Sequence, residues 1–419
     1  MTIACNDLSV NDDEPTPKVV LSYGLGEDST AILLRWLEDP ASRDFGLDDL
    51  VVVSAMTGDE WDATRTVIEE RVLPRLAAAG VRFVQVARAR RHVSTTGDGV
   101  VILDDSRTPA RLYLEGAYTL YDEMVEAGTI PQSGGARICS VHAKGDALDA
   151  VIARLTRGRP YRHVMGFEAG ERRRAEKDAG YNTDLRTGEY PLIEWGWFRG
   201  DAIAYTESVI GTGVGKSACT FCPFAFANKQ NRSEIFARYA ADPAVGAKTL
   251  LMEHLALSLN PAQGLVGGRR LIDMLRAEEM TGVLEAFDAV LAAQAHALYE
   301  VRRILRPRKS DPGKLGNAVR SVRIRGRGTE ASLQAVLERL AAEGEAKGLI
   351  ERQVGEDGIV RVYQHRRGPL FPAIERYFVV APALATAKEH ANFDRWWADA
   401  LTAHHTAPAN VAPALASAA

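Results

Sequence analysis

Short apolar runs rich in β-branched residues alternate with helical patterns through the first half of this 419-residue chain. Four of these runs are expected to be buried strands, at 18–22, 50–54, 81–86 and 162–166. The segments that follow the first two have the pattern of helices. Strands that alternate with helices form parallel sheets covered on both faces. The first half therefore predicts an α/β domain with a Rossmann-like parallel sheet.

The pattern changes after this domain, which we expect to span residues 17–227. Long helical stretches over 228–305 predict a helical extension. Residues 306–318 are rich in Pro, Gly and basic residues and predict a linker. A polar arm at 1–16 precedes the domain, and the Ala- and Pro-rich tail at 406–419 is expected to be disordered.

Residues 319–405 have a third pattern. A short strand at 319–324 precedes a helix from 330 to about 345, and two strands follow at 349–354 and 359–363. A helix followed by a hairpin is typical of a winged helix. We therefore expect a small winged-helix-like α+β module.

The overall composition excludes some classes of protein. The formal net charge of -4 gives no global reason to expect nucleic acid as a partner. No apolar stretch reaches the roughly 18 residues that span a bilayer, and the polar start does not resemble a signal peptide. We therefore expect a cytoplasmic protein with no membrane partner.

One local segment, 302–327, is strongly basic and contains a single acid, Asp311. Such a density would suit a DNA or tRNA phosphate backbone. The alternative is a solubilising linker and an exposed strand face. The basic residues are Arg302, Arg303, Arg306, Arg308, Lys309, Lys314, Arg320, Arg323, Arg325 and Arg327.

The segment from Ser22 to Thr30, SYGLGEDST, lies between the first strand and a helix. Its glycines let the backbone turn tightly, and the first helical turn presents unpaired N–H groups to an anion. This predicts a phosphate cradle. The alternative is a turn without a ligand, in which Asp28 and Ser29 cap the helix.

The cradle resembles the Ser-x-Gly-Gly-x-Asp-Ser loop of the PP-loop ATP pyrophosphatases, especially the branch that contains the phosphoadenosine-phosphosulfate reductases. Leu25 stands where a glycine is usual in that family, and Glu27 stands where a lysine often lies. The matching residues are Gly24, Gly26, Asp28, Ser29 and Thr30.

Further segments resemble the family's motifs in the same order along the chain, and together they cover roughly residues 17–230. They are 56–64 (Asp-Thr-Gly-x-Glu-x-x-x-Thr), 137–144 (Arg-x-Cys with a later Lys), 166–174 (Gly-x-x-x-x-Glu-x-x-Arg), 190–195 (Pro-Leu-x-x-Trp) and 217–224 (Ser-Gly-Cys-x-x-Cys-Pro).

The resemblance implies a HUP-type sheet with ATP across the carboxyl ends of its strands, and Mg²⁺ held by Asp59 or Glu60. The nucleotide-binding residues that it implies are Ser22, Tyr23, Gly24, Gly26, Asp28, Ser29, Thr30, Thr57, Gly58, Asp59, Glu60 and Gly166. The catalytic residues that it implies are Asp28, Ser29, Lys144, Arg172 and Arg174, the last three to neutralise phosphate charge.

The cysteines suggest a metal site. Cys219 and Cys222 have the spacing that lets both sulfurs reach one metal, and Cys139 and His142 form a second such pair. These four residues would hold zinc. The rival is an iron–sulfur cluster on the three cysteines, either with His142 or Cys5 as the fourth ligand or with one iron left open. A third possibility is that they are ordinary buried cysteines.

No cysteine follows Cys222, so the thiolate nucleophile of a sulfonucleotide reductase is missing. We therefore expect an ATP pyrophosphatase that adenylates a substrate for attack by sulfur or nitrogen. The closest analogy is the ATP-pyrophosphatase component of DNA phosphorothioation systems, which implies DNA as substrate and a sulfur-donor protein as partner. A small-molecule or tRNA substrate is an alternative, and so is a nucleotide-sensing or nucleic-acid-binding protein with a degenerate cradle.

Overall fold

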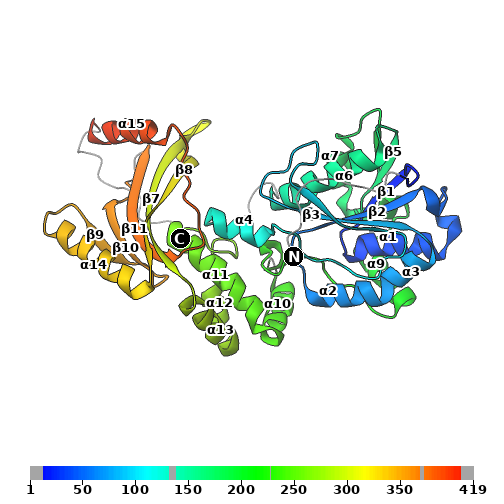
Figure 1. Cartoon of the computed structure of the whole chain (residues 1–419), viewed down its shortest axis with the longest axis horizontal. Coiled ribbons are helices and arrows are strands. Elements are labelled where there is room, and N and C mark those ends of the chain that lie inside the picture. The colour runs from blue at the N-terminus through cyan, green and yellow to red at the C-terminus, as the bar shows by residue number, and fades with distance from the viewer. Residues whose placement is uncertain (1–12, 132–137, 227, 369–371, 407–419) are drawn as a thin grey trace. The chain divides into compact units, whose positions relative to one another are not determined.

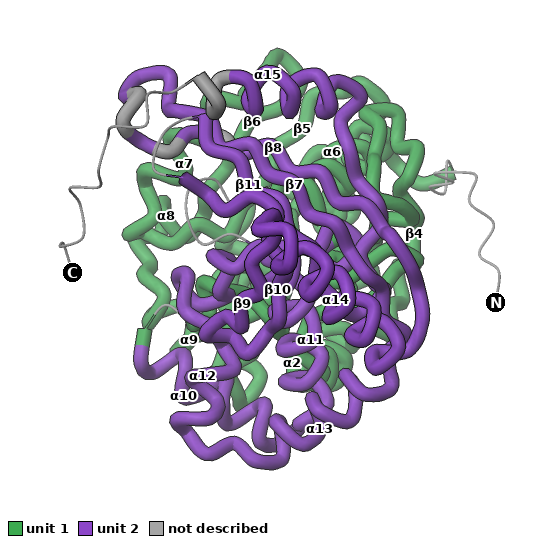
Figure 2. Tube along the Cα trace, turned by 90° about the vertical axis from the view of Figure 1, so that its left-hand side faces the viewer, with its two compact units in different colours: residues 1–123, 132–228 green, residues 124–131, 229–419 purple. Residues whose placement is uncertain are grey.

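The computed structural model describes residues 13–131, 138–226, 228–368 and 372–406. The chain divides into two compact units (Figures 1 and 2). Unit 1 comprises residues 1–123 and 132–228, and unit 2 comprises 124–131 and 229–419. Cys5 and Arg137 lie outside the described residues. Most of the predicted arm and nearly all of the predicted tail lie outside them too.

The described part of unit 1 contains a six-stranded, mostly parallel sheet in the order β4-β3-β2-β1-β5-β6. Only β4, at one edge, pairs antiparallel with its neighbour. The prediction of an α/β domain with a mostly parallel, Rossmann-like sheet is confirmed at this level. The strands are β1 (Val19–Ser22), β2 (Leu50–Met56), β3 (Arg82–Arg88), β4 (Val100–Ser106), β5 (Tyr161–Val164) and β6 (Arg186–Glu189).

Helices cover both faces of this sheet because alternate residues of its buried strands point to opposite sides. On one face, Leu21 and Val52 pack with Ile32 of helix α1 (Glu27–Glu38). On the other face, Val20 and Val51 pack with the apolar side of helix α6 (Asp146–Thr156). The remaining helices of this half of the chain are α2 (Asp62–Val67), α3 (Leu73–Ala78), α4 (Leu120–Ala127), α5 (Ile138–Ser140), α7 (Arg172–Ala179), α8 (Pro191–Glu194) and α9 (Arg199–Ile210).

The strand order reverses at β1. Val20 of β1 pairs with Val51 of β2 on one side and with His163 of β5 on the other, and all three strands are parallel. The chain therefore builds β2 and β3 on one side of β1 before it crosses to β5. In open α/β sheets, such a point leaves a crevice at the carboxyl ends of the two strands, where ligands bind.

Unit 2 contains helices and a five-stranded sheet in the order β8-β7-β11-β10-β9, in which all neighbouring strands pair antiparallel within the described residues. The helices are α10 (Lys229–Ala241), α11 (Pro243–Leu259), α12 (Leu271–Ala277), α13 (Thr281–Ala292), α14 (Glu330–Glu345) and α15 (Phe393–Thr406). The strands are β7 (His296–Arg308), β8 (Asp311–Gly328), β9 (Glu351–Val354), β10 (Val360–His365) and β11 (Ala373–Pro382).

The two faces of this second sheet are covered differently. On one face the buried Tyr377 donates a hydrogen bond of 3.2 Å to the carbonyl of Ser258 in α11. On the other face α14 packs on an apolar cluster that includes Phe378, and α15 packs on a second cluster around Ile304. The helix and hairpin expected of a winged helix are present as α14, β9 and β10, but they belong to this larger sheet. The winged-helix module is not confirmed.

Residues 306–318 lie in the hairpin of β7 and β8 where a linker was predicted, and β7 begins at His296, inside the predicted helical extension. The pairing shifts register around Pro307. Such irregularities accommodate proline, which has no N–H for the ladder. The proline and glycine content that suggested a linker therefore marks bulges in a long hairpin.

A search of the helices in the described ranges finds none long and apolar enough to cross a membrane.

Candidate functional site

The cradle joins β1 to α1 with an open helix N-terminus. Gly26 is the N-cap residue of α1, and no side chain makes a capping hydrogen bond there. Ser29 instead donates its hydroxyl to the carbonyl of Gly26 at 3.3 Å. The first N–H groups of a helix have no partners within the helix, so those of α1 are available to an anion. The alternative of a turn capped by Asp28 or Ser29 does not describe this geometry.

Leu25 has a backbone conformation that glycine would adopt without strain. Its φ angle is 61°, in the left-handed region that disfavours residues with a Cβ. Its side chain is only 3% exposed and belongs to the core cluster on the α1 face of the sheet. Burial of the side chain therefore offsets the backbone strain that glycine would avoid.

Glu27 and Asp28 are both buried at the start of α1. Burial raises the pKa of both carboxyl groups, and repulsion from neighbouring acids raises the pKa of each further. Glu27 accepts a hydrogen bond of 2.6 Å from the N–H of Gly215, and Asp28 forms an ion pair with Arg199. Asp28, predicted to be catalytic, thus has a cation of this same unit as its partner.

Glycines bring distant segments against the cradle. A Cβ at Gly166, which follows β5, would lie 3.0 Å from the backbone nitrogen of Ser29. A Cβ at Gly26 would lie 3.8 Å from the Cβ of Ser217. The segments that follow β1 and β5 therefore meet at the switch point of the sheet, and the segment before Cys219 lies against them.

Glu60 ties the loop after β2 to that last segment. Its carboxylate accepts hydrogen bonds from the hydroxyl of Ser217 at 2.6 Å, the N–H of Ala218 at 3.1 Å and the hydroxyl of Thr64 at 3.3 Å. The neighbouring Asp59 is buried and accepts a hydrogen bond of 3.0 Å from the N–H of Tyr121. Both carboxylates therefore bind donors of the protein.

Cys219 lies beside the same loop. Its Sγ is 3.2 Å from the hydroxyl of Thr57. Burial raises the pKa of the Cys219 thiol to about 12, and attraction to the Lys144 ammonium opposes that rise. The structure thus brings Cys219 to Thr57, with Lys144 near enough to attract the Cys219 thiolate.

The metal predictions are wrong. Across the described ranges there is no group of three or more His, Cys, Asp or Glu side chains that could hold a metal ion. His142 is 57% exposed and bonds Asp146, with 2.8 Å between Nδ1 and Oδ2, while the Sγ of Cys219 contacts the hydroxyl of Thr57. The expected zinc ion or iron–sulfur cluster on Cys139, His142, Cys219 and Cys222, and the expected Mg²⁺ on Asp59 or Glu60, are therefore withdrawn.

The arginines after β5 are in different situations. Arg174 forms an ion pair with Glu171, and its guanidinium lies over the ring of Phe167, 4.4 Å from the centroid. Arg172 is exposed at the first position of α7. Arg174 is thus engaged by its own segment, whereas Arg172 faces solvent.

Sequence reasoning missed Arg199 and His163. Arg199 reaches Asp28 from the start of α9. The imidazole Nε2 of His163, in β5, lies 2.7 Å from the hydroxyl of Ser22, at the start of the cradle. The parallel pairing of β1 with β5 could have suggested the second contact, but no local pattern marks Arg199.

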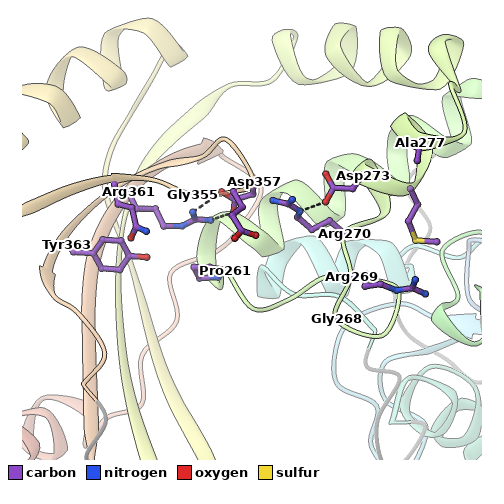
Figure 3. A pocket seen from close by; sticks show the side chains of 13 residues that line it. Pro261, Gly268, Arg269, Arg270, Asp273, Ala277, Gly355, Asp357, Arg361 and Tyr363 are labelled. Atoms are coloured by element: carbon purple, nitrogen blue, oxygen red, sulfur yellow. Dashed lines mark hydrogen bonds and ion pairs between the residues drawn. The ribbon is translucent and has the colours of Figure 1, made fainter. Parts of the chain in front are cut away.

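Unit 2 has a pocket of about 670 Å³ between α12 with its preceding loop and the β9–β10 hairpin (Figure 3). Arg361 is paired there with Asp357, and Arg270 is paired with Asp273. Their charges are therefore balanced within the lining. A phosphate finds no open helix N-terminus of the kind that α1 offers, so the cradle is the better candidate for a nucleotide.

The basic segment 302–327 is largely engaged by its own unit. Arg302 and Arg323 pair with Glu389 and Asp394, and Arg325 pairs with Glu300. Arg303 pairs with Glu375, Lys314 with Asp311, and Arg320 donates to the carbonyls of Ala127 and Gly128. This geometry agrees with a structural role for these six residues.

Comparisons of the chain with protein-family models, with curated proteins and with solved structures find no match. The assignment of a function therefore rests on the residues of the site.

Proposed function

We propose that this chain is an ATP pyrophosphatase of the PP-loop type, with a HUP-type domain that holds ATP at the N-terminus of α1. The observation that carries the proposal is the close approach of Gly166 to Ser29 at the switch point of the sheet. Because a side chain at Gly166 would press on the backbone of Ser29, glycine lets the segment after β5 lie this close to the cradle without a shift of either segment. An uncapped helix N-terminus at such a crevice suits a phosphate chain.

The proposed reaction transfers AMP. A nucleophilic oxygen of the substrate attacks the α-phosphorus of ATP, the bond to the bridging oxygen breaks, and pyrophosphate leaves with its electron pair. A sulfur or nitrogen nucleophile then displaces AMP from the adenylated substrate. In this scheme the N–H groups of α1 bind phosphate oxygens, and Lys144, near enough to Cys219 to attract its thiolate, stabilises negative charge that develops in the transition state.

The test is incubation of the whole chain with ATP labelled on the α-phosphate, with candidate acceptors and with magnesium chloride in the buffer. Labelled AMP together with pyrophosphate supports the proposal. Labelled ADP contradicts it, because cleavage would then fall between the β and γ phosphates.

A nucleotide sensor is the second candidate, and the left-handed backbone of Leu25 favours it because a non-glycine loop differs from the usual cradle. Tight binding of ATP with no AMP formed for any acceptor would support this candidate. We propose no nucleic acid as the acceptor, since Arg302, Arg323 and Arg325 of the segment that suggested one are paired with carboxylates.

A further inference from the structure

We infer that Arg199 contacts the phosphate chain of the bound nucleotide, that Asp28 positions it there, and that the site therefore selects nucleoside triphosphates over monophosphates. The inference rests on the proposed function and adds to it a residue that the sequence motifs do not contain. It starts from the ion pair between Arg199 Nη2 and Asp28 Oδ2.

The position of Arg199 follows from two helix ends. Asp28 is in the first turn of α1, at the open N-terminus of the cradle, and Arg199 is the first residue of α9. The start of α9 is fixed because the N–H of Phe198 donates to the carboxylate of Asp201 at 2.8 Å. The guanidinium is therefore held at the mouth of the cradle by a backbone that is itself anchored.

Arg199 retains donors for a ligand. Its side chain is 49% exposed, whereas that of Asp28 is 12% exposed. A guanidinium has five N–H donors, and the hydrogen bond to Asp28 uses a single nitrogen, Nη2. The remaining N–H groups can bind phosphate oxygens with charge-assisted hydrogen bonds while Asp28 keeps the group in place.

The charges around the cradle make such a cation necessary. Glu27 is next to Asp28, and the proximity of Glu168 and Glu171 helps to raise the pKa of the Asp28 carboxyl. Four carboxyl groups thus surround the helix end where the phosphates would lie. Arg174 is already paired with Glu171, so Arg199 is the arginine placed to offset repulsion of a triphosphate.

The experiment measures binding of ATP and AMP to the full chain by calorimetry, for the wild type and for Arg199→Ala, Arg199→Lys and Asp28→Asn. The matched control is Arg90→Ala, because Arg90 is a similarly exposed arginine of unit 1 that forms an ion pair with Asp98. We expect Arg199→Ala to weaken ATP binding about 10- to 100-fold, the loss of one or two hydrogen bonds to a charged group, and AMP binding less than about 3-fold. Arg199→Lys should recover part of the ATP affinity, and Arg90→Ala should change neither.

Asp28 is tested as a positioning residue with a double mutant. Asp28→Asn should weaken ATP binding in the wild-type background, because it acts through Arg199. In the Arg199→Ala background the same change should cause no further loss, and should strengthen binding slightly because it removes one carboxylate that repels the phosphates. Additive losses would contradict that role. Arg199→Lys keeps a cation at this position and serves as the variant to compare if Arg199→Ala does not fold.

The outcomes separate the two proposals. If the wild type binds no ATP, the proposed function fails and this inference fails with it. If the wild type binds ATP and Arg199→Ala binds it equally well, only this inference is overturned. An equal loss for ATP and AMP also overturns it, since that result would indicate a structural role rather than a contact with the phosphate chain.

Discussion

His163 donates a hydrogen bond from its imidazole Nε2 to the hydroxyl of Ser22, 2.7 Å away and 141 positions earlier in the chain. The direction follows from the other ring nitrogen, because Nδ1 lies 2.9 Å from the Nε of Arg186, which can only donate. The neutral imidazole must therefore carry its proton on Nε2. This contact joins β5 to β1 at the residue where the cradle begins.

Protonation of His163 should destabilise the protein. Burial and the Arg186 guanidinium lower the pKa of His163 to about 4, below the value of about 6.5 in an unfolded chain. The folded state thus binds fewer protons than the unfolded state, so this contribution is fully present above pH 6.5 and is lost as the pH falls through 4. Its upper limit is about 3 kcal/mol in the free energy of unfolding.

Urea unfolding at pH 7 and pH 4.5 measures this effect. The wild type should lose more stability between these two pH values than His163→Gln, which has no group that titrates there. Equal losses for the two proteins would show that His163 does not carry the dependence.

At Leu25 we expect the glycine variant to be more stable than the alanine variant, which reverses the usual order of stability. Leu25→Ala removes a buried side chain but keeps a Cβ at a φ of 61°, so we expect a loss of about 3 kcal/mol in the free energy of unfolding. Leu25→Gly removes the same side chain and also relieves the left-handed strain, which is worth about 1 kcal/mol. Leu25→Gly should therefore be the more stable variant by about that amount.

Leu33 provides the control for this comparison, because it is fully buried within the helical backbone of α1. At Leu33 the alanine variant should be more stable than the glycine variant by about 0.5–1 kcal/mol. Chemical denaturation of all four variants checks both orders. The same order at both positions would mean that the backbone of Leu25 is not strained.

The local patterns of the sequence predicted the buried strands and the open turn of the cradle, because hydrophobic runs and glycine positions reflect local structure. They could not predict the contact of Arg199 with Asp28, which are 171 positions apart and meet only through the packing of α9 on α1. The cysteine spacing was misleading for a related reason. It shows that two sulfurs can reach one point, but not that Cys219 contacts Thr57 while His142 bonds Asp146.

Composition was misleading in unit 2. Pro307 and its basic neighbours suggested a linker, yet β7 pairs with β8 on either side of the register shift. The arginine density suggested a nucleic-acid surface because carboxylate partners such as Glu300 and Glu389 come from other strands and turns. Pairing across a sheet is thus the part of this fold that local sequence patterns do not show.

Gly355 should tolerate no side chain. A Cβ at this position would lie 2.3 Å from Asp357 Oδ1 and 2.7 Å from Arg361 Nη1. That carboxylate cannot easily move, because it also accepts a hydrogen bond of 3.0 Å from the N–H of Ile359 and is ion-paired with buried Arg361 (Figure 3). We expect Gly355→Ala to lower the free energy of unfolding by about 1–3 kcal/mol.

A double mutant distinguishes this clash from a general effect of alanine. In the Asp357→Ala background the carboxylate is absent, so Gly355→Ala should cost clearly less than in the wild type. Urea unfolding of the wild type, both single variants and the double variant gives the coupling. If Gly355→Ala costs the same in both backgrounds, the carboxylate does not restrict this position.

Cys219 should react slowly with alkylating agents in the folded protein. Burial raises the pKa of its thiol to about 12, which leaves on the order of one molecule in ten thousand as thiolate at pH 8. Since the thiolate is the reacting form, iodoacetamide should modify Cys219 at least about 1,000-fold more slowly in the folded chain than in guanidinium chloride. Mass spectrometry of the peptide that contains Cys219, in a Cys222→Ser background, follows this one sulfur.

Lys144→Ala should slow the reaction further because the ammonium favours the thiolate. Lys18, at the far end of β1, is exposed, and Lys18→Ala should leave the rate unchanged. A folded-state rate close to the unfolded rate would show that the pKa of the Cys219 thiol is not raised.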